Sequence, residues 1–234
     1  MDRKQIVAAV FILALCLALA AVRRMPPEAS ETAASVPLSG LTIVLDPGHG
    51  GYDQGCQGAS GTLEAPLNLD VSLRLRAVLR DMGARVVMTR EEDRSLVDPN
   101  ASGNRKKQDM ALREDVIVGS GADILLSIHM NAYKKPGPAG AQTYYREDSA
   151  EGADLAGAIQ AAFRALDDRH DQAARCGDYF VLGTCEAAAL VECGFLSNPR
   201  EEALLRTEAY RELLANTIAQ GVVGYWVPPE GSVR

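Results

Sequence analysis

Short apolar runs alternate with longer stretches of helical periodicity along most of this chain. Residues 41–45 (LTIVL) and 124–128 (ILLSI) have one polar member each, and residues 84–89 (ARVVMT) have one at each end of an apolar centre. Runs of four to eight mostly apolar residues predict strands buried on both faces of a parallel sheet. Similar short runs predict three further strands, at residues 141–145, 179–182 and 188–191.

Helical spacing separates the first two predicted strands. Thr62 is the predicted N-cap, Gly83 ends the run, and between them apolar residues recur at Leu67, Val71, Leu75, Val78, Leu79 and Met82. Strands that alternate with helices predict an α/β fold, here a single open, mostly parallel sheet of about five or six strands with helices on both faces. The other predicted helices cover residues 109–120, 151–166, 201–206 and 208–226.

Two histidines directly follow predicted strands. His49 comes after Asp46-Pro47-Gly48, where proline and glycine take the chain out of the sheet, and His129 follows the strand at 124–128. The carboxyl ends of parallel strands form the edge where ligands bind in open α/β sheets. A histidine satisfied within its own loop is the structural alternative for His49.

Two glutamates complete the candidate site at the same edge. Glu64 lies in the first turn of the first predicted helix, and Glu192 follows the strand at 188–191. Two imidazoles and one carboxylate, with a fourth position left to water, form the ligand set of a catalytic zinc site, and Glu192 would be the general base. The alternatives are stabilisation of Glu64 by the helix dipole, and an ion pair of Glu192 with Arg113 or Arg200.

Two polar residues near this set have weaker assignments. Asn131 follows His129 and is either a substrate-side residue or, by preference, the holder of its own loop through an Asx-type bond. His170 lies in the polar run at 167–171 and is predicted to be a solvated surface residue.

Composition excludes some classes of function. The chain has 234 residues, a formal net charge of -7 and no basic stripe interleaved with aromatic residues, so nucleic acid is not expected as a partner. The cysteines outside the N-terminal apolar run have no CxxC spacing and are predicted to be free thiols: Cys56, Cys176, Cys185 and Cys193.

The first forty residues differ from the rest. Residues 6–22 carry no charge and lie between two basic pairs, which predicts a signal peptide or, by preference, an uncleaved signal anchor within residues 1–24. Residues 25–40 are rich in Pro, Ala, Ser, Thr and Glu and predict a flexible linker. The remaining divisions are a catalytic domain at 41–227 and a tail at 228–234.

Four ordered motifs carry a family resemblance: LDPGHGG at 45–51, GTLE at 61–64, SIHMNA at 127–132 and VECGFLSN at 191–198. Together they resemble the zinc-dependent N-acetylmuramoyl-L-alanine amidases, peptidoglycan hydrolases with an α/β fold. The resemblance covers about residues 41–225. It implies one Zn²⁺ bound by His49, Glu64 and His129, with Glu192 as the catalytic glutamate. Pro66 departs from the family pattern, although proline is tolerated in a first helical turn.

A finer resemblance is to the spore-cortex branch of that family. It rests on VMTR at 87–90, RK at 105–106 and GAQ at 140–142. The branch implies removal of the stem peptide from muramic acid, a step toward muramic-δ-lactam. The N-terminal apolar segment predicts that the enzyme is membrane-tethered or secreted, outside the cytoplasmic membrane. In a spore former this location is the intermembrane space around the forespore. Peptidoglycan is the expected substrate, and an accessory or targeting protein is a possible partner.

Three alternatives remain open at this point. The chain could be a vegetative wall amidase acting in division or turnover. It could be a non-catalytic peptidoglycan-binding protein that kept the fold. It could also use zinc to cut another bond of the same polymer, as a carboxypeptidase or a deacetylase.

Overall fold

One six-stranded sheet forms the centre of the computed structural model, which describes residues 36–135 and 137–227. The strand order is β2-β1-β3-β6-β4-β5. Neighbours run parallel except β4 and β6, which are antiparallel. The predicted mostly parallel sheet is therefore confirmed. The strands are β1 (Thr42–Pro47), β2 (Arg85–Met88), β3 (Ile124–Asn131), β4 (Gln142–Tyr145), β5 (Arg175–Cys176) and β6 (Ala188–Phe195).

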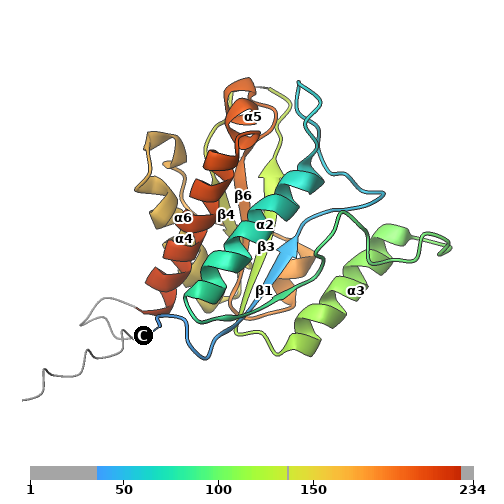
Figure 1. The fold of residues 1–234 in the computed structure, drawn as a ribbon, viewed down its shortest axis with the longest axis horizontal. Helices are drawn as coiled ribbons and strands as arrows, with labels where there is room; N and C mark the ends of the chain where they lie inside the picture. Colours follow the sequence, from blue (N-terminus) through green and yellow to red (C-terminus); the bar gives the residue numbers. More distant parts are fainter. Residues whose placement is uncertain (1–35, 136, 228–234) are drawn as a thin grey trace, which may run out of the picture. The chain divides into compact units, whose positions relative to one another are not determined.

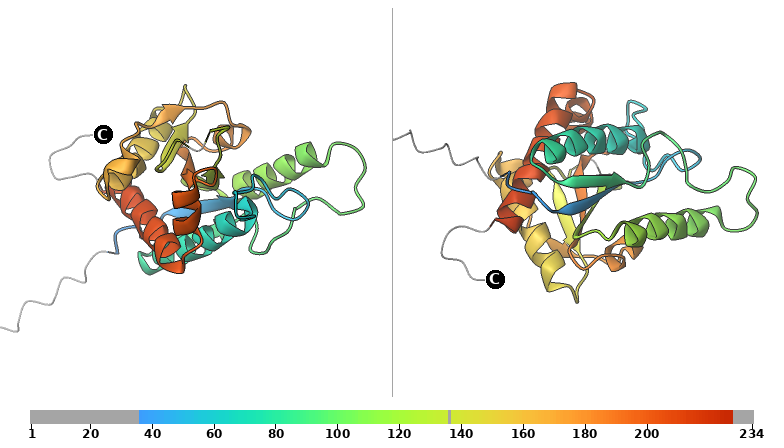
Figure 2. Two further views of the ribbon diagram at one scale, coloured as in Figure 1. Left: turned by 90° about the horizontal axis from the view of Figure 1, so that it is seen from above. Right: turned by 60° about the horizontal axis from the view of Figure 1, so that its bottom comes forward.

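Helices cover both faces of this sheet, as the sequence predicts. Helices α2, α4 and α6 contribute side chains to the main core on one face, and α3 packs on the other. The right-hand view of Figure 2 shows α2 and α3 on opposite sides of β1. Figure 1 shows α2 and α6 side by side in front of the strands. The helices are α2 (Glu64–Asp81), α3 (Arg105–Ser120), α4 (Ala150–Arg164), α5 (Pro199–Leu205) and α6 (Glu208–Trp226).

One of the six strands is not the one predicted. Residues 179–182 were expected to form a strand, but Phe180–Gly183 is a 3₁₀ helix (η2), whose Val181 and Leu182 fill the smaller core beneath α3. A short apolar run does not distinguish a strand from another buried segment. The strand at the edge of the sheet is instead β5, which is two residues long and exposed.

Strand β6 is longer than predicted. It continues to Phe195, so that Glu192 lies within the strand rather than after it. Helix α3 also begins earlier than expected, at Arg105, because the side chain of Asn104 accepts a hydrogen bond from Lys107 N at 3.0 Å and caps the helix.

The N-terminal boundary differs from the sequence-based division. Residues 36–40, assigned to the linker, form a turn in which Leu38 is fully buried in the main core and its N–H bonds Met82 O at 2.9 Å. The proposed signal segment, most of the linker and the tail lie outside the described residues. Among the described residues, no helix has the length and apolarity needed to span a membrane. The four cysteines in this part of the chain are free thiols, as predicted.

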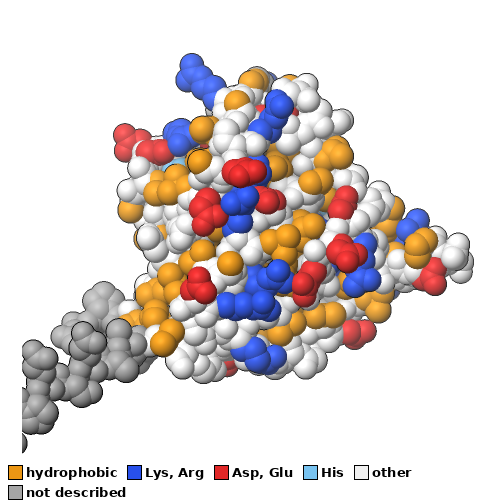
Figure 3. Space-filling view, in the orientation of Figure 1, with side chains coloured by type: hydrophobic (Ala, Val, Ile, Leu, Met, Phe, Trp, Pro, Cys, Tyr) orange, Lys and Arg blue, Asp and Glu red, His pale blue; other side chains and the backbone are white. Residues whose placement is uncertain are grey.

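Ion pairs bridge α2 and α6 on the face drawn in Figure 3, where acidic and basic side chains are interspersed. Arg74 pairs with Asp70 at 2.9 Å and with Glu212 at 3.0 Å, and Arg211 also pairs with Asp70. Because these groups are partly exposed, the apolar contacts beneath them contribute more to the packing of the two helices than the ion pairs do.

His170 is not the solvated residue that its polar neighbours predicted. Its ring is fully buried, packs against Phe163 at 5.5 Å between centroids, and accepts a hydrogen bond from Ala141 N at Nδ1 (2.8 Å). The polar run supplies only the exposed residues around it. Burial lowers the pKa of His170, and the Arg169 charge lowers it further against the opposing effect of Asp167.

This burial predicts a pH-dependent contribution to stability. Because the folded pKa lies below the unfolded one, the contribution is complete above about pH 6.5 and is lost as the pH falls below that value. We expect the free energy of unfolding to fall less steeply between pH 7.5 and 5.5 in His170→Asn, whose Oδ1 replaces Nδ1 as acceptor. Urea denaturation at each pH measures the difference. Equal slopes in the two proteins would contradict this role.

Candidate active site

The turn after β1 places His49 in an unusual backbone conformation. His49 has a φ of 61°, and it is the one non-glycine residue with positive φ among the described residues. Gly48 before it lies so close to the His129 ring that an added Cβ would be 2.1 Å from Cε1. Backbone strain of this kind persists only where the surroundings impose it.

Two buried arginines impose that conformation. Arg90 donates to Pro47 O at 2.9 Å through Nε and to Gly48 O at 2.9 Å through Nη2. Arg113 donates to Pro47 O at 2.9 Å and to His49 O at 2.6 Å. Every carbonyl from Pro47 to His49 therefore accepts a hydrogen bond from a guanidinium.

Arg113 is held in turn by two acids. Its Nη1 lies 2.7 Å from Asp46 Oδ1, and its Nε lies 2.8 Å from Asp109 Oδ2. Asp46 also accepts hydrogen bonds from the hydroxyls of Thr89 at 2.7 Å and Ser127 at 2.9 Å. Burial alone would raise the pKa of Asp46, but the charge and hydrogen bonds of Arg113, with Thr89, bring it below its usual range.

Glu64 begins α2 beneath the two histidines. Thr62 is not its cap: the helix starts at Glu64, with no side-chain cap, because loop carbonyls accept the first amides, Glu64 N to Cys56 O at 3.0 Å and Ala65 N to Gln54 O at 3.2 Å. The Glu64 carboxylate is buried and accepts hydrogen bonds from Cys56 N at 2.8 Å and from Asn68 Nδ2 at 3.2 Å.

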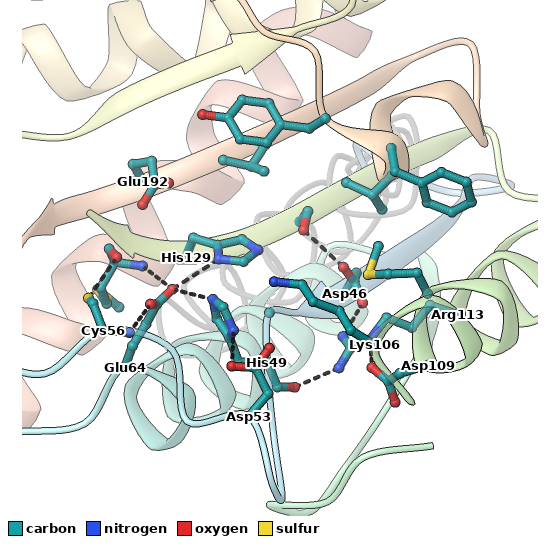
Figure 4. Close-up of a pocket in the computed structure, with 18 of the residues that line it drawn as sticks. Asp46, His49, Asp53, Cys56, Glu64, Lys106, Asp109, Arg113, His129 and Glu192 are labelled. Carbon is teal, nitrogen blue, oxygen red and sulfur yellow. Dashed lines mark hydrogen bonds and ion pairs between the residues drawn. The ribbon is translucent and has the colours of Figure 1, made fainter. Parts of the chain in front are cut away.

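The structure brings the three predicted metal ligands together, as Figure 4 shows. Glu64 Oε1 lies 2.9 Å from His129 Nδ1 and 3.2 Å from His49 Nε2, and one ligand atom from each residue lies within 4.8 Å of the others. The other nitrogen of His49, Nδ1, lies 3.0 Å from Asp53 Oδ1. The parallel pairing of β1 with β3 explains this convergence, because it sets Pro47 beside Ile128.

Glu192 faces the same opening from the next strand (Figure 4). It pairs in register with His129 across β3 and β6, so the two side chains project from the same face of the sheet. Neither predicted alternative partner holds it: Arg113 pairs with Asp46 and Asp109, and no ion pair joins Glu192 to Arg200 among the described residues. Glu192 Oε2 is buried without a hydrogen-bond partner in the described part of the chain.

The two acids have opposite electrostatic surroundings. Burial raises the pKa of Glu64, but hydrogen bonds and charges from His129 and His49 outweigh burial and hold it far below its usual range. Burial raises the pKa of Glu192 to about 7, with Glu64 adding to the rise and both histidines opposing it. Glu64 is therefore a permanent anion, whereas Glu192 is suited to exchange a proton near neutral pH.

The donor set fits a catalytic zinc ion. Two imidazole nitrogens and one carboxylate oxygen are typical ligands of such a site, and a cysteine-rich closed set is absent from this cluster. The bond from His49 Nδ1 to Asp53 is also typical, because metal-binding histidines usually donate their second nitrogen to a carboxylate or carbonyl. The His49–Glu64 contact raises the pKa of His49 despite burial, with Asp53 adding to the effect.

Several residues of the site were not predicted from sequence. Asp53 orients His49, and Asn68 binds both Glu64 and Gly48 O, the latter at 3.1 Å. Asn68 is four residues after Glu64, so helical spacing could have placed the two on one face. Asp53 had no such signal, because its position depends on the turn at His49. Asn131 lines the cavity of about 460 Å³ that His49, Glu64 and His129 also line.

Substitution of Gly48 tests how closely the turn fits His129. We expect Gly48→Ala to weaken zinc binding by about 5- to 160-fold, the equivalent of the 1–3 kcal/mol that overpacking costs, because the new Cβ would displace the His129 ring. Zinc titration against a competing chelator measures the affinity. Gly119→Ala on α3 is the control, since nothing lies within 4 Å of its added Cβ. Equal affinities in the two variants would contradict the expected displacement.

An α/β sheet with two imidazoles, a buried carboxylate and a second acid at its carboxyl edge defines a metallohydrolase. The chain matches the family model described as N-acetylmuramoyl-L-alanine amidase over residues 43–223 and belongs to that family. The family is generally zinc-dependent. The protein is accordingly an N-acetylmuramoyl-L-alanine amidase whose substrate is peptidoglycan, and its possible metal site consists of His49, Glu64 and His129.

Individual relatives agree with this assignment. The germination-specific N-acetylmuramoyl-L-alanine amidase of Bacillus subtilis is 39% identical over 204 residues, which cover 84% of this chain and 86% of the relative. The probable cell wall amidase LytH of Staphylococcus epidermidis is 32% identical over 203 residues, 85% of this chain and 62% of LytH. The structure of the CwlD amidase from Clostridioides difficile in complex with the GerS lipoprotein has a TM-score of 0.76 at 33% identity, covering 79% of this chain and 98% of that one.

Proposed function

We propose that this amidase uses zinc to hydrolyse the amide between the lactyl carbonyl of N-acetylmuramic acid and L-alanine. The observation that carries the proposal is the convergence of His49, Glu64 and His129 within 4.8 Å. Their donor atoms would hold the ion. When bound, zinc polarises a carbonyl oxygen and lowers the pKa of a coordinated water to about 7.

Glu192 moves the proton in this proposal. Its carboxylate accepts a proton from the attacking water as the carbon–oxygen bond forms. It then donates the same proton to the alanine nitrogen as the carbon–nitrogen bond breaks, which leaves a lactyl carboxylic acid and an amine. The second proton of the water passes from the acid to the amine, so the products are a carboxylate and an ammonium group. A pKa of about 7 before the ion binds places the group near the range in which both transfers are efficient. Glu64 remains ionised throughout, because its neighbours stabilise the anion.

The proposed biological substrate is the spore cortex, where the reaction is a step toward muramic-δ-lactam. The similarity to a germination-specific amidase supports this choice. The similarity to a probable cell wall amidase supports the second candidate, a vegetative wall amidase acting in division or turnover. The two candidates share the bond and the site and differ in the polymer.

We place the enzyme outside the cytoplasmic membrane, tethered by its N-terminal segment or secreted, and in a spore former in the space around the forespore. The charge-free run at residues 6–22 supports export. Because a similar amidase forms a complex with a lipoprotein, a lipoprotein is also the proposed accessory partner of this chain.

Product analysis tests this function. We expect mass spectrometry of cortex peptidoglycan treated with the full chain to find intact stem peptides with free L-alanine amino termini. Treatment with a zinc chelator should abolish their release, and added zinc should restore it. Loss of only a terminal residue or of an acetyl group would instead identify a carboxypeptidase or a deacetylase. Faster release from vegetative wall would favour the second candidate.

A further inference from the structure

A second cavity, of about 330 Å³, lies beside the metal site. Asn131 lines both cavities, so the two are neighbours at the end of β3. The volume is within the range of small-ligand sites. We call this cavity the stem groove; its polar and aromatic lining includes Asn131, Tyr133, Gln142, Tyr144, Gln172 and Arg175.

The stem groove and His129 lie on opposite sides of Glu192. Across β3, β6 and β4, the residues in register are His129, Glu192 and Gln142, whose side chains share one face of the sheet. Gln142 is 5% exposed, and its Nε2 has no hydrogen-bond partner among residues 36–135 and 137–227, while its Oε1 accepts from the Tyr144 hydroxyl at 2.9 Å. A buried, unpartnered amide beside an active site is a candidate contact for substrate.

The chemistry of the reaction decides which part of the substrate lies here. The departing nitrogen must reach Glu192 to receive its proton, and every atom beyond that nitrogen belongs to the stem peptide. The peptide therefore continues past Glu192, away from His129, and enters the stem groove at Gln142.

Arg175 supplies the charge that a stem peptide requires. Arg175 is exposed and lies on β5, in register with Tyr144 of β4. Its Nη2 donates a hydrogen bond to the neutral Oε1 of Gln172 at 3.1 Å. The described part of the chain contains no ion pair of this guanidinium. In stem peptides, D-glutamate is joined to L-alanine through its amino group and to the third residue through its γ-carboxyl, so that its α-carboxylate is free.

The distances are compatible with this contact. Strands β6 and β5 are two strand spacings apart, about 10 Å. A dipeptide in extended conformation spans about 7 Å, and the arginine side chain covers the remainder. We propose that the stem groove binds the first two residues of the stem peptide and that Arg175 recognises the α-carboxylate of D-glutamate, which deepens the proposed function and rests on Glu192 protonating the leaving nitrogen.

A binding experiment tests the groove without turnover. The metal-free full chain is titrated by NMR with L-alanyl-D-glutamate whose γ-carboxyl is capped as an amide, and with the same compound whose α-carboxyl is also an amide. We expect wild type to bind the acid about fivefold more tightly than the amide, Arg175→Gln to bind both equally, and Arg175→Lys to recover part of the preference. Lys134→Gln, which removes an exposed charge outside the groove, should behave as wild type. A preference that survives in Arg175→Gln, or that wild type lacks, would overturn the proposal.

A turnover experiment connects the groove to catalysis. With muramoyl dipeptides that differ only in this carboxylate, Arg175→Gln should raise KM for the acid about fivefold, leave KM for the amide unchanged, and keep kcat within twofold. An equal rise for both substrates would show that Arg175 does not read the carboxylate. If zinc-loaded wild type cleaves neither substrate, the proposed function fails, and the binding experiment still decides the role of the groove.

Discussion

Replacement of Glu192 by glutamine is expected to lower kcat by about 10³-fold, within the 10²- to 10⁴-fold range of general acid–base catalysis. The amide is similar in size to the carboxylate but cannot accept the proton of the attacking water at neutral pH. Because the metal-ligand cluster consists of His49, Glu64 and His129 and excludes Glu192, zinc content should remain at that of wild type. Steady-state kinetics and metal analysis of the same preparation give the two values.

The matched control is Glu186→Gln. This glutamate precedes β6, is 62% exposed, and pairs with Arg146 at 3.6 Å, away from the metal ligands. The Glu186→Gln variant should retain wild-type activity. If Glu192→Gln kept more than a tenth of wild-type kcat, Glu192 would not be the base. If the variant contained less zinc than wild type, Glu192 would be a ligand.

Replacement of Arg113 by methionine is expected to lower the free energy of unfolding by about 3–5 kcal/mol at pH 7, the usual effect of removing one partner of a buried ion pair. The change leaves the buried carboxylate of Asp46 without its guanidinium and the carbonyl of His49 without a donor. Urea denaturation measures the loss. Arg76→Met is the control, because the Arg76–Glu91 pair is at the surface and should contribute less than about 1 kcal/mol.

At acid pH, the difference in the free energy of unfolding between wild type and Arg113→Met should become smaller. Since the folded pKa of Asp46 lies below its unfolded value of about 3.9, its ion pair contributes fully above that pH and is lost as the pH falls below it. Without Arg113, burial raises the pKa of Asp46, so the carboxyl is neutral at low pH and its burial costs less. A gap between wild type and variant that is the same at pH 3.5 and pH 7 would contradict this explanation.

The sequence predicted that the three candidate metal ligands lie together, because their placement depends on strand order and strand ends. His49 and His129 each follow an apolar run, and parallel pairing alone brings such ends together. Glu64 was found because it begins the intervening helix. These positions follow from the topology of the fold and do not require knowledge of side-chain packing.

The buried arginines that hold the turn at His49 could not be predicted from strand order and strand ends. Arg90 and Arg113 lie in charged segments that resemble solvated loop and helix surface, yet both are at least 98% buried. Their burial depends on carbonyls of the turn at His49, which the sequence pattern does not reveal. His170 is a similar case, since neighbouring charges concealed a residue that packs on Phe163.

The location of η2 was missed for a different reason. Its residues are as apolar as those of a strand, and the short β5, with Arg175 and Cys176, has no apolar pattern at all. The number of strands was therefore right while one of them was assigned to the wrong segment. This matters for function because β5 carries Arg175 of the stem groove.

Anomalous diffraction at the zinc edge, from crystals of the full chain grown with zinc, tests the central claim most directly. We expect one peak per chain, about 2.0–2.2 Å from a nitrogen of His49, a nitrogen of His129 and an oxygen of Glu64, with the remaining position open toward Glu192. A peak at another site, or direct coordination by Glu192 in place of any of these three residues, would contradict the account.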